Sequence, residues 1–258
     1  MSPRQLEKAS RIARLAVGNP IAVIRYLRSN LRLKIFGIKN KKAANTIRRV
    51  IHQGLTYKTL DGLCDLAQVA IENEKRGLDG TVIEAGCALG GSAITLASAK
   101  NKNRMFFVYD IFSMIPPPSE RDEPDVHELY KVITSGKRPG IRGDLYYGYQ
   151  ENLYDKVLKS FADLGFEVQE NNVHFVKGLF EDALKVTSPV SLAHIDCDWY
   201  DSVLTCLNQI EPHLVKGGTL VIDDYFYFSG CRAAVHKYFD NRPGFEFIKK
   251  TVLHIIKI

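Results

Sequence analysis

The sequence predicts an α/β fold, a Rossmann-like domain with a mostly parallel seven-stranded sheet and helices on both faces. From residue 81 onward, apolar runs of strand length alternate with stretches that have helical periodicity. The run 104–110 is apolar almost throughout, as is typical of a parallel strand that helices cover on both sides. A glycine-rich turn at residues 86–91 joins the first of these runs to the first helical stretch.

Seven segments have the length and apolar content of strands: 81–86, 104–110, 171–178, 191–198, 219–225, 245–250 and 251–258. Four segments between them have helical spacing of apolar residues: 91–100, 179–186, 199–218 and 230–242. The helix expected over 199–218 ends in Gly217 and Gly218, which we interpret as a C-cap. The order of the segments favours an open, doubly wound sheet.

Two segments fall outside this alternation. Residues 1–54 are predicted to form a basic helical N-terminal segment, which ends in a turn at Gly54, and residues 55–258 to form the main domain. Within that domain, residues 111–171 separate the second and third strands, although a plain crossover needs only about 10–12 residues. Long insertions on a rigid scaffold often contact substrates, so we expect this insertion to cover the substrate.

The charge of the chain is unevenly distributed. Residues 1–50 hold 13 Lys and Arg residues and one acid, Glu7, so they carry +12 within a chain of net charge +6. Such an arm could bind nucleic acid or an anionic membrane surface. We favour helices that pack on the main domain or on a second subunit, as a lid or oligomer contact, because nucleic-acid motifs are lacking. The apolar residues expected to pack on the main domain are Ile12, Leu15, Ile21, Ile24 and Leu27.

The sequence also argues against several classes of protein. It has no run of about 18 apolar residues, so we expect no membrane-spanning helix. Its first 20 residues lack the apolar core and cleavage site of a signal peptide. Its five cysteines are scattered and form no C-x-x-C pair, which argues against a disulfide framework and against a zinc site. We therefore expect a cytoplasmic protein.

The glycine-rich turn places Gly86, Gly90 and Gly91 in the pattern G-x-x-x-G-G. This pattern differs from the G-x-G-x-x-G fingerprint of dinucleotide-binding folds, and the chain lacks the G-x-x-x-x-G-K-[ST] sequence of a P-loop. A ligand without a pyrophosphate is therefore favoured. As an alternative, Gly90 and Gly91 only allow a helix to pack closely on the sheet.

Three polar residues near this turn indicate the ligand. Glu84 ends the first strand, where a carboxylate can meet a cationic group. Ser92 can cap the next helix, whose N-terminal amides favour an anionic group. Asp110 ends the second strand, where a carboxylate can accept hydrogen bonds from two ribose hydroxyls. A ligand that has an amine, a carboxylate and a ribose is S-adenosylmethionine. As an alternative, Glu84 simply faces solvent at the end of its strand.

Two pairs of acids follow apolar strands: Asp196 and Asp198 in "HIDCDWYDS", and Asp223 and Asp224 in "VIDDYF". Open α/β sheets bind ligands at the carboxyl ends of their strands, so these acids are expected to gather in one crevice. Clustered carboxylates without a cysteine or histidine cluster suit Mg²⁺ or a similar ion. Asp198 could instead cap the following helix, and His194 is expected to be a satisfied core residue.

Several motifs resemble, in order and spacing, the macrocin O-methyltransferase (TylF-type) family: "VIEAGCALGGSA", "VYDIFSMIPPP", "FVKGLFEDAL", "HIDCDWYDS" and "VKGGTLVIDDY…GCRAAVHKYF". The resemblance covers roughly residues 55–240, and the paired "DCD" and "DD" blocks are its most specific part. Members are class I enzymes that depend on S-adenosylmethionine and Mg²⁺. Those best known methylate sugar hydroxyls of macrolide or aminocoumarin natural products. The resemblance therefore implies an O-methyltransferase with a small-molecule hydroxyl acceptor.

The resemblance also implies roles for individual residues. The metal ligands would be Asp196, Asp223 and Asp224, and Asp196 would also be the general base. The cofactor residues would be Glu84, the turn with Gly86, Gly90, Gly91 and Ser92, then Asp110, and Asp182 for the adenine amino group.

Two other functions are possible. The acceptor could be a catechol or another phenol, with the same cofactor and metal. The chain could also be a non-catalytic module that binds nucleic acid or a membrane surface through its basic arm, although the acidic cluster argues against this. Tyr146, Tyr147 and Tyr149 could stack on the acceptor or belong to ordinary packing. We expect a homo-oligomer, a dimer or higher, and no nucleic-acid partner.

Overall fold

The computed structural model describes residues 20–258. Seven strands form one sheet in the order β3-β2-β1-β4-β5-β7-β6. They are β1 (Thr81–Ala85), β2 (Phe106–Asp110), β3 (Val173–Lys177), β4 (Val190–Ile195), β5 (Leu214–Ile222), β6 (Phe245–Lys249) and β7 (Leu253–Lys257). β1 to β5 are parallel, whereas β7 is antiparallel to both β5 and β6. The predicted fold, a mostly parallel seven-stranded α/β sheet, is confirmed.

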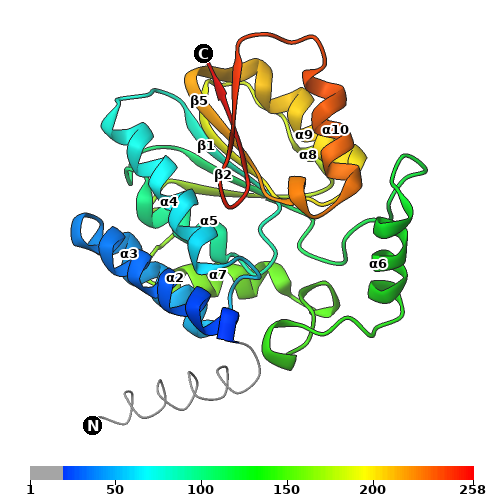
Figure 1. The fold of residues 1–258 in the computed structure, drawn as a ribbon, viewed down its shortest axis with the longest axis horizontal. Helices are drawn as coiled ribbons and strands as arrows, with labels where there is room; N and C mark the ends of the chain where they lie inside the picture. Colours follow the sequence, from blue (N-terminus) through cyan, green and yellow to red (C-terminus); the bar gives the residue numbers. More distant parts are fainter. Residues whose placement is uncertain (1–19) are drawn as a thin grey trace.

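Helices cover both faces of this sheet, with α3, α4 and α5 on one side and α8, α9 and α10 on the other (Figure 1). The helices are α2 (Pro20–Lys39), α3 (Lys41–Gln53), α4 (Leu60–Lys75), α5 (Gly91–Ala99), α6 (Pro124–Thr134), α7 (Leu153–Asp163), α8 (Phe180–Ala183), α9 (Tyr200–Ile210) and α10 (Ser229–Phe239). Short 3-10 turns are η1 (Ile141–Gly143), η2 (Tyr147–Tyr149), η3 (Glu211–His213) and η4 (Asp224–Phe226). Within residues 20–258, no helix is both long and apolar enough to cross a membrane.

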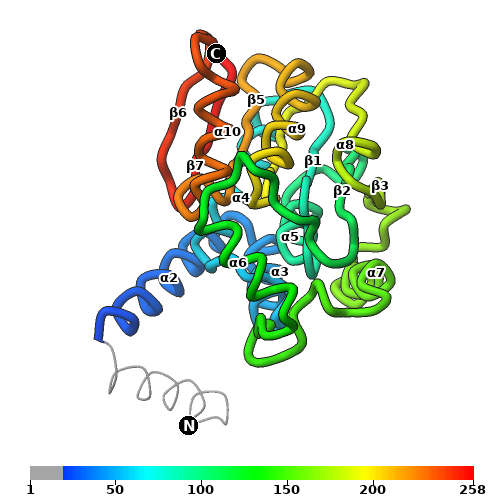
Figure 2. Tube along the Cα trace, turned by 90° about the vertical axis from the view of Figure 1, so that its right-hand side faces the viewer, coloured from blue at the N-terminus to red at the C-terminus, as the bar shows by residue number. Residues whose placement is uncertain are grey.

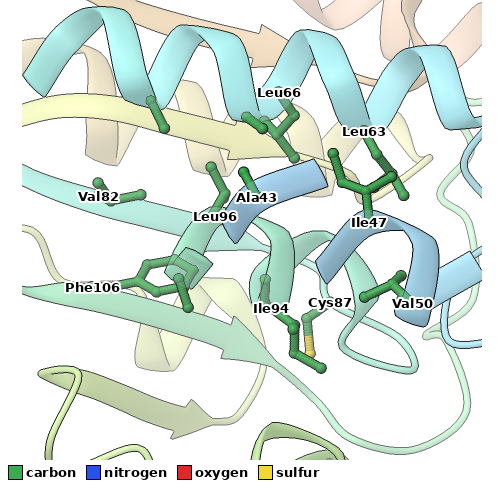
Figure 3. Packing of buried hydrophobic residues seen from close by; sticks show 14 of the residues in the cluster. Ala43, Ile47, Val50, Leu63, Leu66, Val82, Cys87, Ile94, Leu96 and Phe106 are labelled. Carbon is green, nitrogen blue, oxygen red and sulfur yellow. The ribbon is translucent and has the colours of Figure 1, made fainter. Parts of the chain in front are cut away.

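The core is divided by the sheet into two layers. Successive residues of a strand point to opposite faces, so Val82 of β1 packs toward α3 to α5, whereas Ile83 joins the cluster beneath α8 to α10. Figure 3 shows the first layer, where Ile47 of α3 and Leu63 of α4 are completely buried. The sheet is thus covered on both faces, and the carboxyl ends of its parallel strands lie at one edge.

The helix expected over 199–218 is shorter than predicted. α9 ends at Ile210, and Gly217 and Gly218 lie inside β5, so their interpretation as a C-cap is wrong. The pairing of β4 with β5 shifts register between Val190 and Leu192, and Gly217 has a φ of 81° in this irregularity. A left-handed residue at a bulge favours glycine, which explains why glycines interrupt a strand.

The N-terminal segment is helical over its described part. α3 ends at the predicted turn, where Gly54 has a φ of 69°. The Thr59 side chain then accepts a hydrogen bond from the N–H of Gly62 (3.1 Å), so it caps α4. α2 contacts both α3 and α4, and its residue Leu33 is buried. This segment is therefore attached to the first helical layer.

The apolar contact expected of this segment is wrong for α2. Two of the five expected contact residues, Ile12 and Leu15, lie outside the described residues. The other three are exposed, with fractional exposures of 68% for Ile21, 66% for Ile24 and 48% for Leu27. α2 therefore packs on the main domain through the side that carries Leu33, and not through the side that carries Ile21, Ile24 and Leu27.

The insertion between β2 and β3 is fixed to the helices that follow β4 and β5. The Asp122 carboxylate accepts a hydrogen bond from the N–H of Tyr200 (2.8 Å) at the start of α9. The Asp125 carboxylate accepts hydrogen bonds from the N–H (3.2 Å) and the hydroxyl (2.5 Å) of Ser229 at the start of α10. Helix N-termini favour negative charge, so these acids anchor the insertion at the carboxyl edge of the sheet.

Candidate active site

A cavity of about 520 Å³ lies at the carboxyl edge of the sheet. Its walls come from residues after β1, β2, β4 and β5, from the loop 55–59 between α3 and α4, and from the insertion. Six predicted site residues line it: Gly86, Ser92, Asp110, Asp196, Asp223 and Asp224. Four others lie outside this lining: Glu84, Gly90, Gly91 and Asp182. The crevice expected at the strand ends is therefore present.

Asp110 holds the glycine-rich turn in place. Its Oδ2 accepts hydrogen bonds from the N–H groups of Cys87 (2.7 Å) and Ala88 (3.0 Å), and its Oδ1 accepts one from Phe112 (2.6 Å). Burial raises the pKa of Asp110, and these three backbone hydrogen bonds oppose the shift. A carboxylate has about four lone-pair sites, so Asp110 can shape the turn and still accept a ligand hydroxyl.

The turn is in direct contact with the end of β4. Gly86 has a φ of 88°, and a Cβ at this position would lie 1.9 Å from the carbonyl oxygen of Asp196. The N–H of Asp196 also donates to the carbonyl of Ala85 (2.9 Å). Position 86 therefore requires glycine both for its φ and for this close approach. The main chain alone sets the spacing between the turn and Asp196.

Glu84 is completely buried, so it does not face solvent. Its carboxylate accepts a hydrogen bond from the Ser92 hydroxyl and lies 2.9 Å from Nδ1 of His194. Burial lowers the pKa of His194, but Glu84 and Asp223 together outweigh burial and raise that pKa to about 9. Glu84 thus lies behind the cavity wall. His194 is buried and paired with Glu84 as a core residue would be, but its side chain also lies beside Asp196 and Asp223.

The other predicted cofactor residues have positions that the sequence could not specify. The N–H of Gly91 donates to the carbonyl of Leu55 (2.9 Å), and a Cβ at Gly91 would lie 2.4 Å from that oxygen. Gly91 therefore allows the loop before α4 to pack on α5, and Gly90 is the N-cap residue of α5. Asp182 lies on α8 beside Glu181, which lines the cavity. Their assignment to a cofactor stays a prediction.

Asp196 and Asp223 follow the adjacent strands β4 and β5. Together with His194 they offer ligand atoms within 4.8 Å of one another, which makes them a candidate metal site. Burial and the charge of Asp223 raise the pKa of Asp196 well above its usual range. Burial alone would also raise the pKa of Asp223, but Lys58 and His194 hold it well below its usual range. Two carboxylates this close are stabilised by a positive charge beside them or by a proton on one of them.

Lys58 provides such a charge. Its ammonium group donates a hydrogen bond to Asp223, lies 3.9 Å from Oδ2 of Asp196 and lies 3.0 Å from Nε2 of His194. The Lys58 side chain is 7% exposed. Burial lowers the pKa of Lys58, but Asp223 and Asp196 outweigh burial and raise it, so the side chain is charged. Lys58 was not predicted, because a single lysine in a loop between two helices carries no motif.

Asp224 and Asp198 form a second acidic pair in the cavity. Oδ2 of Asp224 accepts a hydrogen bond from the N–H of Asp198 (3.1 Å). Burial raises the pKa of both carboxyl groups, and burial together with the charges of Asp196 and Asp223 raises that of Asp198 to about 7. The N-cap position of α9 falls on Trp199, so Asp198 is a cavity residue and the capping alternative is wrong. Two of the three predicted metal ligands therefore belong to the candidate metal site, and Asp224 stands beside it.

Tyrosines from two segments line the cavity. Tyr57 comes from the loop before α4, and Tyr146 and Tyr147 come from the insertion. The centroid of the Tyr57 ring lies 6.4 Å from that of Tyr146 and 6.1 Å from that of Tyr147. Tyr149 has another role, because its hydroxyl donates to the carbonyl of Ile133 within the insertion. Stacking on a ligand is thus open to two of the three tyrosines that the sequence singled out.

The order of the strands, the glycine-rich turn after β1 and the acidic cavity at the carboxyl edge define a class I methyltransferase. The chain belongs to the macrocin O-methyltransferase (TylF) family, whose model matches residues 35–250. The family resemblance is therefore confirmed, and the match begins about 20 residues earlier than the resemblance did. The protein is an O-methyltransferase, and membership of this family implies S-adenosylmethionine as the methyl donor.

Similar proteins agree with this family. The chain is 27% identical over 203 residues to the mycinamicin III 3''-O-methyltransferase of Micromonospora griseorubida, covering 74% of this chain and 71% of that protein. It is 26% identical over 195 residues to the 8-demethyl-8-(2,3-dimethoxy-alpha-L-rhamnosyl)-tetracenomycin-C 4'-O-methyltransferase of Streptomyces olivaceus, covering 73% and 68%. The solved structure of the O-methyltransferase NovP has a TM-score of 0.67 and 20% identity, covering 89% of this chain and 98% of that one. This last likeness supports the fold.

Proposed function

We propose that the enzyme transfers the methyl group of S-adenosylmethionine to a sugar hydroxyl of a glycosylated natural product. The observation that carries this proposal is the single cavity that Asp110 and Gly86 share with Asp196 and Asp223. The names of the two relatives support the acceptor class, because one is a 3''-O-methyltransferase of mycinamicin III and the other acts on a rhamnosyl tetracenomycin. A catechol or other phenol is the less favoured acceptor.

The donor is expected to lie over the glycine-rich turn. Gly86 lines the cavity directly after β1, and Ser92 lines it at the start of α5, where helix amides favour the carboxylate of the ligand. Asp110 lines it beside them and would accept hydrogen bonds from the ribose. Glu84 would act on this site through Ser92, since its carboxylate is buried behind that hydroxyl.

The acids of the cavity fit a divalent cation. Asp196 and Asp223 present carboxylate oxygens, which Mg²⁺ prefers, and Asp224 lines the same cavity. We propose these three residues as ligands of Mg²⁺. The ammonium group of Lys58 would have to withdraw from Asp223 when a cation binds, because two positive charges would otherwise meet at close range.

Different residues of the cavity have different proposed roles in methyl transfer. Bound S-adenosylmethionine supplies an activated methyl group, and bound Mg²⁺ lowers the proton affinity of a hydroxyl beside it. Asp196 accepts the proton of the acceptor hydroxyl, from a strand end that the contact with Gly86 fixes. Tyr57, Tyr146 and Tyr147 hold the acceptor and exclude water from the cavity. Alignment of this kind can supply up to roughly 7–11 kcal/mol in favourable intramolecular reactions.

An assay with labelled donor tests the proposed acceptor class. The purified protein is incubated with S-adenosylmethionine carrying a radioactive methyl group and with a glycosylated macrolide, its aglycone or a catechol. We expect label on the glycosylated compound alone, at a position that mass spectrometry places on the sugar. Label on the catechol alone would favour the phenol alternative, and transfer to the aglycone would contradict a sugar acceptor.

A substitution of Asp110 tests the donor site. We expect Asp110→Ala to weaken the binding of S-adenosylhomocysteine by roughly 10–100-fold, because hydrogen bonds to a charged group are lost. Isothermal titration calorimetry measures this effect. Asp163→Ala is the matched control, since Asp163 is an exposed carboxylate that pairs with Lys159 on α7. Equal affinity in Asp110→Ala and wild type would contradict the assignment.

Two further expectations remain proposals. We propose a homo-oligomer, which light scattering coupled to size-exclusion chromatography would detect as a mass above 29.1 kDa. We also propose a cytoplasmic location, since all five cysteines lie within the described residues and are free and buried. Cell fractionation tests this location.

A further inference from the structure

α2 presents a row of apolar side chains to the outside. Within residues 20–258, six exposed large apolar side chains belong to this helix: Ile21 (68%), Ile24 (66%), Leu27 (48%), Leu31 (58%), Ile35 (60%) and Ile38 (79%). Their spacing of three or four residues places them on one face of the helix. We call this face the α2 stripe. An exposed apolar row of this length marks an interaction surface.

Basic side chains border the α2 stripe on both sides. Successive residues of a helix are rotated by about 100°, so Arg28 and Lys39 flank one side of the stripe and Lys34 flanks the other. All three are exposed. The sequence from residue 20 to residue 53 contains nine Lys and Arg residues and no acid. The helix therefore combines an apolar face with a purely cationic border.

The α2 stripe is held in a fixed orientation by the opposite side of the helix. Arg32 pairs with Asp65 and, at 3.6 Å, with Asp61 of α4. The hydroxyl of Ser29 donates a hydrogen bond to Asp61 (2.5 Å), and Leu33 is buried. These contacts face inward, so the apolar stripe and its basic border are turned away from the main domain.

We propose that α2 docks the enzyme on the surface of an anionic phospholipid membrane. A helix with an apolar face and flanking Lys and Arg residues lies in the membrane interface, with the apolar side chains among the lipids and the cations at the headgroups. Anionic headgroups also attract each nearby Lys or Arg residue. The docking surface is separate from the catalytic cavity, so the inference does not depend on the identity of the acceptor.

The charge and the apolar face of α2 favour an anionic membrane over two other partners, α2 of a second copy and nucleic acid. If α2 paired with α2 of a second copy, Arg28, Lys34 and Lys39 would meet like charges, because the helix has no acid. Nucleic acid would satisfy the cations but would leave the α2 stripe in water, since phosphates offer no apolar surface. An anionic bilayer satisfies both the stripe and its border.

The position of α2 relates this surface to the active site. α2 leads through α3 into the loop 55–59, which lines the cavity. In Figure 2, α2 extends from the end of the molecule at which α3, α6 and α7 lie. A membrane on the α2 stripe would therefore lie near the end that carries the cavity, and the enzyme would meet acceptors that are attached to lipids or held at the membrane.

Vesicle sedimentation with the full-length protein tests the proposal. We expect the protein to bind vesicles that contain phosphatidylcholine and phosphatidylglycerol. Its affinity for vesicles of pure phosphatidylcholine should be lower by at least roughly tenfold. Leu31→Gln/Ile35→Gln keeps the net charge and is expected to lose roughly tenfold in vesicle affinity. The matched control is Val132→Gln/Phe247→Gln, which changes apolar residues of α6 and β6 with exposures of 44% and 47% and should bind like wild type.

Further measurements separate the outcomes. Each variant should keep the wild-type shift in melting temperature with S-adenosylhomocysteine, which shows that it is folded. Arg28→Gln/Lys34→Gln should bind more weakly and with less dependence on salt. Wild-type protein that stays in the supernatant with anionic vesicles, or unchanged binding by Leu31→Gln/Ile35→Gln, would overturn the proposal. A third outcome would also overturn it: the wild-type protein is a dimer that does not bind vesicles, and Leu31→Gln/Ile35→Gln is a monomer. A second copy of the chain would then cover the α2 stripe.

Discussion

Asp196→Asn is expected to lower kcat by roughly 10²–10⁴-fold, because the variant cannot accept the proton of the acceptor hydroxyl. Asparagine has nearly the same shape, so the backbone contacts of Asp196 with Gly86 and Ala85 should persist. The affinity for S-adenosylhomocysteine should therefore change little, since the turn and Asp110 carry it. Steady-state kinetics and calorimetry measure the two effects separately.

Two other carboxylates serve as controls for Asp196. Asp201→Asn should retain normal kcat, because Asp201 lies on α9 and pairs with the exposed Arg121. Asp223→Asn should lose activity that a higher Mg²⁺ concentration partly restores, since the proposed role of Asp223 is that of a ligand. Asp196→Asn should not recover in this way. Wild-type kcat in Asp196→Asn would remove Asp196 from the role of general base.

Chelation by EDTA is expected to reduce methyl transfer to less than roughly a hundredth of its rate, and added Mg²⁺ should restore it. The affinity for S-adenosylhomocysteine should stay nearly constant, because the proposed cation contacts Asp196 and Asp223 and not the glycine-rich turn. Full activity in EDTA, together with elemental analysis that finds no divalent ion in the protein, would overturn the metal assignment.

A substitution of Lys58 provides a second test of the metal site. If its ammonium group competes with a cation for Asp223, Lys58→Met should strengthen Mn²⁺ binding by roughly tenfold, as electron paramagnetic resonance would measure. Lys131→Met, at an exposed position of α6, should leave that binding unchanged. Loss of activity in Lys58→Met, combined with full wild-type activity in EDTA, would instead show that Lys58 itself serves as the positive charge of the site.

The sheet and the acidic crevice could be predicted because both depend on local pattern. Apolar runs of strand length mark the strands, and parallel strands bring their carboxyl ends to one edge. Acids that directly follow two such runs, such as Asp196 and Asp223, must then meet. The same logic placed Asp110 next to the glycine-rich turn, where it accepts hydrogen bonds from backbone amides.

The remaining features depend on contacts between distant segments, which periodicity does not record. Lys58 reaches Asp223 across 165 positions of sequence, and Asp122 reaches Tyr200 across 78. Glu84 was expected at an open strand end, but it is buried, and its carboxylate contacts Ser92 and His194. The side of α2 that is buried depends on the partners that α4 offers, so helical spacing alone could not identify it.

The contact between Gly86 and Asp196 bears on how this enzyme can change its acceptor. The two segments meet through their main chains at this point. The position of the glycine-rich turn relative to Asp196 therefore does not depend on the rotamer of a side chain. The proposed acceptor side is lined by side chains of the loop 55–59 and of the insertion 111–171, which do not take part in this backbone contact. In the proposed mechanism, the main chain would therefore set the distance between the methyl donor and Asp196, whereas the side chains around them would select the acceptor.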